Sequence, residues 1–221
     1  MKYFTACLIF LVIGVSSPAY SENVLYLTGS DWCPYICTDV KDSNKLAKNP
    51  GYLVEIIKYA LNEYEIKYES PSWERAIKET REGTYDAIIG IYRSVAPELV
   101  YPARKLGFSE MCFYVEKGNP WIYKGITSLS EIRLGIIEGY FYDEGEVDQY
   151  ISDFSQDAKR IEGIAGNRGL IQNLEKMLLR RITGVIDDHQ VVQYTILANN
   201  LPDRFKQAGC LEGIDVQIGF S

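Results

Sequence analysis

The sequence predicts an α/β protein built from two successive lobes, each a mixed, mostly parallel sheet flanked by helices. Short β-branched and aromatic runs alternate with amphipathic helical stripes over residues 24–91, which is typical of parallel strands covered by helices. The same alternation starts again after residue 110. No flexible Pro/Ser-rich linker separates the two sets, so we expect strands to join the lobes and to permit hinge motion about a cleft.

The first lobe begins with a strand over residues 24–28 that ends in the loop Gly29-Ser30-Asp31. Gly51 opens a helix whose apolar residues recur at steps of three and four. Residues 65–69 return as a strand, and Ser72 is placed to cap a helix from Trp73 to about residue 81. The compact apolar run over residues 85–91 predicts a buried strand.

The second set of elements is similar in size. Strands are predicted at 111–115, 134–137 and 182–186, with a short apolar stretch at 161–164, and a further strand at 216–220 follows this set. Helices are predicted at 143–151, between 170 and 178, and at 190–197. Ser128-Leu129-Ser130-Glu131 fits a capping box, which predicts a helix start at that point.

The first 21 residues have the layout of a secretory signal peptide. A basic start at Lys2 precedes an almost wholly apolar run over residues 4–15, and small residues follow, with cleavage expected after Ala19 or Ser21. The apolar run is well short of the ~20 residues that cross a bilayer. We therefore expect an exported protein that resides in the periplasm.

The acidic net charge argues against nucleic acid or an anionic membrane as a partner, and the single histidine argues against a metal site. The formal net charge is −7, and it becomes −8 when Lys2 leaves with the signal peptide. An acidic chain of this kind is a poor match for nucleic acid or an anionic membrane surface. His189 has no second histidine to share a metal, so neither a metal site nor a cofactor is predicted.

Four cysteines remain after the signal peptide: Cys33, Cys37, Cys112 and Cys210. Export into an oxidising compartment makes pairing plausible, and four cysteines allow three connectivities. The pair Cys33 and Cys37 is favoured because it closes a short loop.

Several segments resemble the family-3 periplasmic solute-binding proteins, the polar amino-acid binders of ABC importers. The matches follow one another in the family's order and cover essentially all of the mature chain. They are Trp73-Glu74-Arg75-Ala76, Tyr85-Asp86-Ala87-Ile88-Ile89-Gly90, Ile126-Thr127-Ser128-Leu129, Leu134-Gly135-Ile136-Ile137-Glu138-Gly139 and Arg181-Ile182-Thr183-Gly184-Val185-Ile186-Asp187-Asp188.

This resemblance implies a type II periplasmic binding-protein fold. Residues 22–110 would form lobe I, residues 111–210 lobe II, and residues 211–221 a hinge strand that returns to lobe I. Family members normally continue with a helix that packs on lobe I. This sequence ends at Ser221, so the resemblance implies either a short member of the family or a truncated one that lacks the C-terminal part of lobe I. The implied partners are a small polar solute, for example an amino acid, and an ABC transporter permease or a sensor. We expect a monomer.

Ligands of open α/β sheets bind beyond the carboxyl ends of the strands, which locates the candidate ligand-binding residues. Aromatic faces there would bury the apolar part of a solute, Arg93 could hold a carboxylate, and Asp188 could accept hydrogen bonds from an ammonium group. Asp188, rather than Asp187, matches the family's amine-binding aspartate. The candidates are Trp32, Tyr35, Trp73, Tyr92, Arg93, Ser94, Gly139, Tyr140 and Asp188.

Structural roles compete with these assignments. The family places its carboxylate-binding arginine later, in a Thr-x-x-Arg pattern, where this sequence has Ser94-Val95-Ala96-Pro97-Glu98. Arg93 is therefore either a substitute or a surface residue in an ion pair. Asp188 could equally cap the following helix, and Trp73 could belong to the core of lobe I.

The sequence favours a protein that binds a solute over an enzyme that catalyses a reaction. The sequence has no Gly-x-Ser-x-Gly motif, phosphate loop or histidine-based triad. The alternative is an enzyme on the same fold, similar to the periplasmic cyclohexadienyl dehydratases, for which Glu138 and Asp188 are the candidate acid or base groups.

Overall fold

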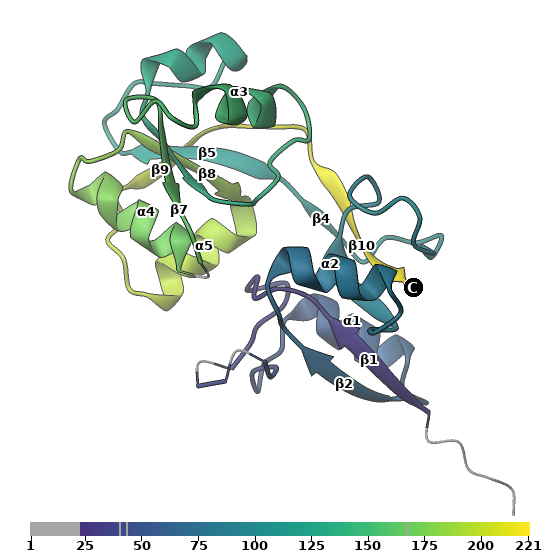
Figure 1. Ribbon diagram of the computed structural model, residues 1–221. Helices are drawn as coiled ribbons and strands as arrows, with labels where there is room; N and C mark the ends of the chain where they lie inside the picture. The colour runs from purple at the N-terminus through teal and green to yellow at the C-terminus, as the bar shows by residue number, and fades with distance from the viewer. Residues whose placement is uncertain (1–22, 40, 43, 167) are drawn as a thin grey trace, which may run out of the picture.

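The computed structural model describes residues 23–221 except residues 40, 43 and 167, and it contains two five-stranded sheets, each with its own helices (Figure 1). The expected signal peptide, residues 1–21, lies outside the described residues. None of the helices within the described part is both long and apolar enough to cross a membrane.

Lobe I is the sheet with strand order β2-β1-β3-β10-β4. β1 pairs in parallel with β2 and β3, whereas β10 runs antiparallel to both β3 and β4. α1 packs on one face of this sheet and α2 packs near β3 on the other. The elements are β1 (Val24–Thr28), α1 (Tyr52–Ala60), β2 (Glu65–Glu69), α2 (Trp73–Arg81), β3 (Ala87–Ile91), β4 (Gly107–Ser109) and β10 (Ile214–Phe220).

Lobe II is the sheet with strand order β7-β6-β8-β5-β9. β6 pairs in parallel with β7 and β8, and β5 runs antiparallel to β8 and β9. Two apolar clusters cover its faces, one with α3 and one with α4 and α5. The elements are β5 (Met111–Glu116), the 3-10 helix η1 (Ile126–Glu131), β6 (Leu134–Ile137), α3 (Glu146–Phe154), β7 (Ile161–Ile164), α4 (Gly169–Leu178), β8 (Gly184–Asp188), α5 (His189–Ala198) and β9 (Phe205–Cys210).

The chain passes between the lobes twice (Figure 1). β4 ends at Ser109 and β5 begins at Met111, so that only Glu110 separates a strand of one sheet from a strand of the other. The return runs from Cys210, at the end of β9, to Ile214, at the start of β10. Two short strand-to-strand connections side by side are a geometry that permits hinge bending.

Some predicted elements differ from the structure. The capping-box interpretation is wrong, because Ser128 lies inside η1, where its hydroxyl donates to the Gly125 carbonyl and accepts from the Lys124 amide. α3 begins at Glu146 and β8 ends at Asp188. β4 and β9 were not predicted. β4 has three residues, and β9 (Phe-Lys-Gln-Ala-Gly-Cys) has no alternating apolar pattern.

Two disulfides are present in the structure. Cys33 is joined to Cys37, the pair that the sequence favoured, and the bond closes the loop after β1. Cys112 is joined to Cys210, which ties the edge strand β9 to β5 within lobe II. The cluster of Glu110, Cys112 and Cys210 therefore has its two sulfur atoms engaged with each other.

Candidate functional site: a pocket between the two lobes

A pocket enclosing about 580 Å³, part of it open to solvent, lies between the lobes. We call it the inner pocket. Lobe I contributes Ser30, Trp32, Ile36, Trp73, Ile89, Gly90, Tyr92 and Val95, and lobe II contributes Met111, Tyr140 and Phe141. Five of these side chains are aromatic, so ring faces and edges dominate the lining. Such a lining suits an apolar or aromatic part of a ligand.

The topology of the sheets places these residues together. Ser30 follows β1, Trp73 opens the helix that follows β2, and Tyr92 comes directly after β3. In lobe II, Tyr140 and Phe141 follow β6. The carboxyl ends of parallel strands meet at one edge of a sheet, and here the two such edges face each other across the pocket.

Gly90 shapes the floor of the inner pocket. Its φ is +82°, a conformation that side-chain-bearing residues rarely adopt, and a Cβ there would lie 3.2 Å from Ile36 Cδ1 and 3.6 Å from Cε3 of the Trp32 ring. Because Gly90 has no side chain, the indole of Trp32 lies close against the backbone of β3.

A second hollow, of about 680 Å³, adjoins the inner pocket and shares Ser30, Trp73 and Tyr140 with it. We call it the outer hollow. Its remaining lining carries three carboxylates, those of Asp31, Glu74 and Glu138, together with Ser70, Pro71, Ser72, Ile137, Gly139 and Gly166. The outer hollow and the inner pocket together form one cleft that is apolar at one end and acidic at the other.

Asp188 is the centre of a buried hydrogen-bond network at the hinge. Its side chain is fully buried, and Oδ1 accepts from the amides of Gln190 and Val191 at the start of α5. Oδ2 lies 3.0 Å from the Tyr35 hydroxyl, 2.8 Å from Ser109 Oγ and 3.2 Å from the amide nitrogen of Glu110. One carboxylate therefore links lobe I, the connecting residues and lobe II.

Two residues of the inner pocket contact this network. The Trp32 ring stacks on Tyr35 with ring centroids 4.1 Å apart, and the Tyr92 hydroxyl donates to Ser109 Oγ at 3.0 Å. Burial, followed by the adjacent Asp188 charge, raises the pKa of Tyr35, so its hydroxyl remains protonated and able to donate. Movements of the pocket aromatics are thus coupled to the hinge by direct contacts.

The sequence candidates divide into two groups in the structure. Trp32, Trp73, Tyr92, Gly139 and Tyr140 line the inner pocket or the outer hollow. Tyr35 and Asp188 lie behind the lining, in the hinge network. Ligand contact by the lining residues stays a prediction.

Arg93 and Ser94 do not line either hollow, although the sequence placed both in the site. Both are exposed, and the Arg93 guanidinium lies over the Tyr101 ring, 4.9 Å from its centroid. The physical reason is the turn after β3, which directs Tyr92 inward and these two residues outward. Met111, Ile36 and Val95 line the inner pocket but were not predicted, because apolar residues carry no sequence signal that distinguishes a pocket wall from a core.

Asp187 is a second buried carboxyl group, next to the hinge network. Oδ1 accepts from the Asp188 amide at 2.8 Å, while Oδ2 has no hydrogen-bond partner among the described residues. Burial first, and then the charge of Asp188, raise the pKa of Asp187 to about 7. Near neutral pH this carboxyl is therefore partly protonated.

No protein-family model and no curated protein matches the chain, but many solved structures do. A histidine kinase sensor domain with similarity to periplasmic binding proteins has a TM-score of 0.68 and 14% identity, covering 90% of this chain and 82% of that one. Truncated, arginine-bound ArgBP from T. maritima has a TM-score of 0.66 and 16% identity, with 90% and 89% covered. A solute receptor for L-cysteine of Neisseria gonorrhoeae has a TM-score of 0.62 and 14% identity, with 90% and 77% covered.

These likenesses confirm the predicted fold class. The chain has the two-lobed fold of periplasmic binding proteins, with a mixed sheet and flanking helices in each lobe.

Proposed function

We propose that the protein is a periplasmic solute-binding protein that captures a small molecule between its lobes. The observation that carries this proposal is the inner pocket, to which both lobes contribute side chains and whose aromatic lining is coupled to the hinge through Tyr35 and Ser109. A ligand that contacts both walls at once favours the closed arrangement over the open one, and this difference in affinity is what shifts the equilibrium.

The proposed partners are an ABC importer permease or a membrane sensor, with the protein acting as a monomer. Solved arginine-binding proteins and a histidine kinase sensor domain share the fold, which supports a role in solute capture for either kind of partner. The two disulfides agree with an oxidising compartment such as the periplasm. We propose binding without catalysis: Glu138, the acid or base candidate at the cleft, is exposed and stands in the outer hollow.

A thermal-shift screen of amino acids, polyamines, organic acids, aromatic amines and short peptides on the mature protein tests this function. A captured ligand raises the melting temperature by mass action. Small-angle scattering of the best ligand complex should show a smaller radius of gyration than the free protein. If no compound class shifts the melting temperature, solute capture is contradicted, and if a compound is consumed over hours, the protein is an enzyme.

Trp73→Ala should weaken binding of the ligand found in the screen by about 10- to 100-fold, because Trp73 belongs to both the inner pocket and the outer hollow. Trp73→Phe should restore much of the affinity. Tyr59→Ala removes an aromatic ring that is 84% exposed on α1, and it serves as the matched control with unchanged affinity. Calorimetric titration of the three variants measures the effect, and equal affinities for Trp73→Ala and Tyr59→Ala would remove Trp73 from the site.

A further inference from the structure

The inner pocket presents no charge to its ligand. None of the described residues that line it is an acid, a lysine, an arginine or a histidine, and its hydroxyl groups are those of Ser30, Tyr92 and Tyr140. A carboxylate brought into such a lining would lose its hydration without gaining a cationic partner, which is costly. The ring faces, in contrast, attract a cation at or near their centres.

The groups that would hold the two ends of an amino acid are engaged elsewhere. Arg93, the candidate for a carboxylate, is exposed and packs over Tyr101. Asp188, the candidate for an ammonium group, is fully buried and accepts five hydrogen bonds from the protein itself. Among the described residues, the cleft therefore lacks the paired charges that a zwitterion requires.

The charges that do face the cleft are carboxylates. Asp31, Glu74 and Glu138 line the outer hollow, and none of them forms an ion pair with any residue that the structure describes. Trp73 and Tyr140 lie between this acidic end and the aromatic end. A molecule with an apolar body and one positive head would fit both ends at once.

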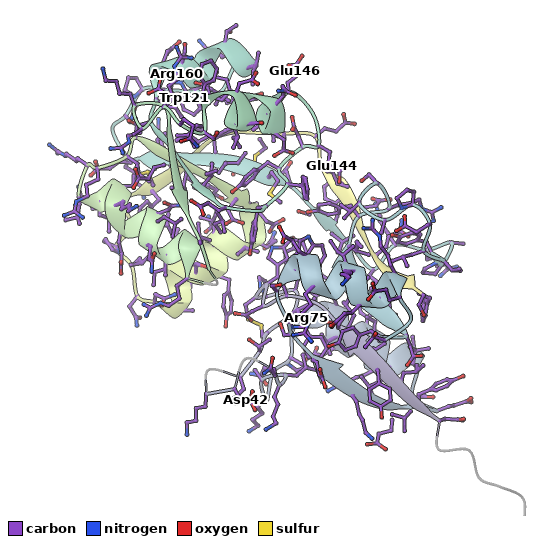
Figure 2. The ribbon with its side chains drawn as sticks, in the orientation of Figure 1. Asp42, Arg75, Trp121, Glu144, Glu146 and Arg160 are labelled. Atoms are coloured by element: carbon purple, nitrogen blue, oxygen red, sulfur yellow. A yellow bond between two sulfur atoms is a disulfide. The ribbon has the colours of Figure 1, made fainter. Side chains whose placement is uncertain are left out.

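The charged groups that act on two pocket tyrosines, Tyr92 and Tyr140, are also negative. Burial is the main cause that raises the pKa of Tyr92 and of Tyr140, and the charges that add to it are all carboxylates. For Tyr92 these are Asp188, Asp187 and Glu144. Figure 2 labels Glu144 on the side of lobe II that faces lobe I. These carboxylates lie near the pocket tyrosines, and their negative charge would attract a cation.

We propose that the ligand is a small organic amine without a carboxylate, whose apolar or aromatic body lies in the inner pocket and whose ammonium group lies in the outer hollow. This inference rests on the proposed function of solute capture and specifies the chemical class of the solute. Stacking and cation–π contacts with Trp32, Trp73 and Tyr140 recognise the body and the adjoining charge, and the carboxylates Glu74 and Glu138 recognise the head.

Three probes with the same ring and different charges test the proposal: 2-phenylethylamine, phenylalanine and 3-phenylpropionate. We expect calorimetric titration of the mature protein to show the amine binding at least about tenfold more tightly than phenylalanine, and 3-phenylpropionate not to bind measurably. Preference for phenylalanine or the anion would overturn the ligand class while leaving solute capture intact. Failure of all three probes would also overturn the ligand class, and the broad screen above then decides separately whether any solute is captured.

Two charge-neutralising variants locate the ammonium group. Glu138→Gln and Glu74→Gln should each weaken binding of 2-phenylethylamine by about three- to tenfold at low salt and reduce its salt dependence, because an exposed carboxylate acts through a screened interaction. Glu131→Gln, at an exposed position in η1, is the matched control and should leave the affinity unchanged. Equal affinities in all three variants would contradict the assignment of the outer hollow to the ammonium group.

Discussion

Asp188→Ala should lower the free energy of unfolding by about 3–5 kcal/mol, a large part of the stability of a protein of this size. The substitution removes the acceptor of five hydrogen bonds and leaves donors without partners, among them the Ser109 hydroxyl and the Glu110 amide. It also removes the cap of α5, which alone contributes about 1 kcal/mol. Urea denaturation followed by circular dichroism measures the change.

Asp203→Ala is the matched control for this prediction. The side chain of Asp203 is 92% exposed and pairs only with Lys117 at the surface, so its removal should change stability by less than about 1 kcal/mol. An Asp188→Ala protein as stable as the Asp203→Ala protein would contradict the hinge network. Tyr35→Phe offers a milder change, since it removes one of the five donors and keeps the ring that stacks on Trp32.

Asp187→Asn should make the protein progressively more stable than the wild type as the pH rises from about 4 to about 7. The pKa of Asp187 is raised from 3.8 to about 7 in the folded protein, so folding retains a proton that the unfolded chain releases over this range. The stability that the protonated carboxyl provides is fully present below pH 3.8 and is lost as the pH rises through about 7. The full difference amounts to about 4 kcal/mol.

The measurement is the difference in unfolding free energy between wild type and Asp187→Asn at several pH values from 4 to 8. The asparagine can still accept from the Asp188 amide through its side-chain oxygen, as Asp187 Oδ1 does. Groups that do not interact with Asp187 cancel in the difference, so the trend reports Asp187 together with its interaction with Asp188. A difference that stays constant with pH would show that the buried carboxyl titrates near its ordinary pKa.

The hinge network explains why the structural role of Asp188 could not be predicted from the sequence. Its position after a buried strand and before a helix predicted either ligand binding or a helix cap, and the structure shows the cap. The second oxygen of the carboxylate faces Ser109 and Tyr35, which lie 79 and 153 residues away in the sequence. Such distant partners leave no local pattern, and so the sequence could not indicate that Asp188 is already satisfied.

The spacing of apolar residues along the chain was sufficient to predict the order of the main helices and strands. Period-two and period-3.6 apolar spacing depends on neighbouring residues alone, and it correctly indicated β1, β2, α2 and β6. It placed β3 and α4 within two residues at one end and β8 two residues early at both ends, and the apolar stripe of α1 continued past the helix end at Ala60. It failed for β4 and β9, whose three residues and mixed composition become strands only because β10 and β5 offer them hydrogen-bond partners.

The sequence by itself determined the two-lobed α/β class and the aromatic residues after the strand ends, because both follow from short-range periodicity and from the rule that ligands sit beyond carboxyl strand ends. Only the tertiary structure decided which of those residues face one another. It turned Trp32, Trp73, Tyr92 and Tyr140 toward the cleft, directed Arg93 to solvent and enclosed Asp188 in the hinge. The direction of a side chain after a strand depends on the turn and on the opposing lobe, which are set by contacts between residues far apart in the chain.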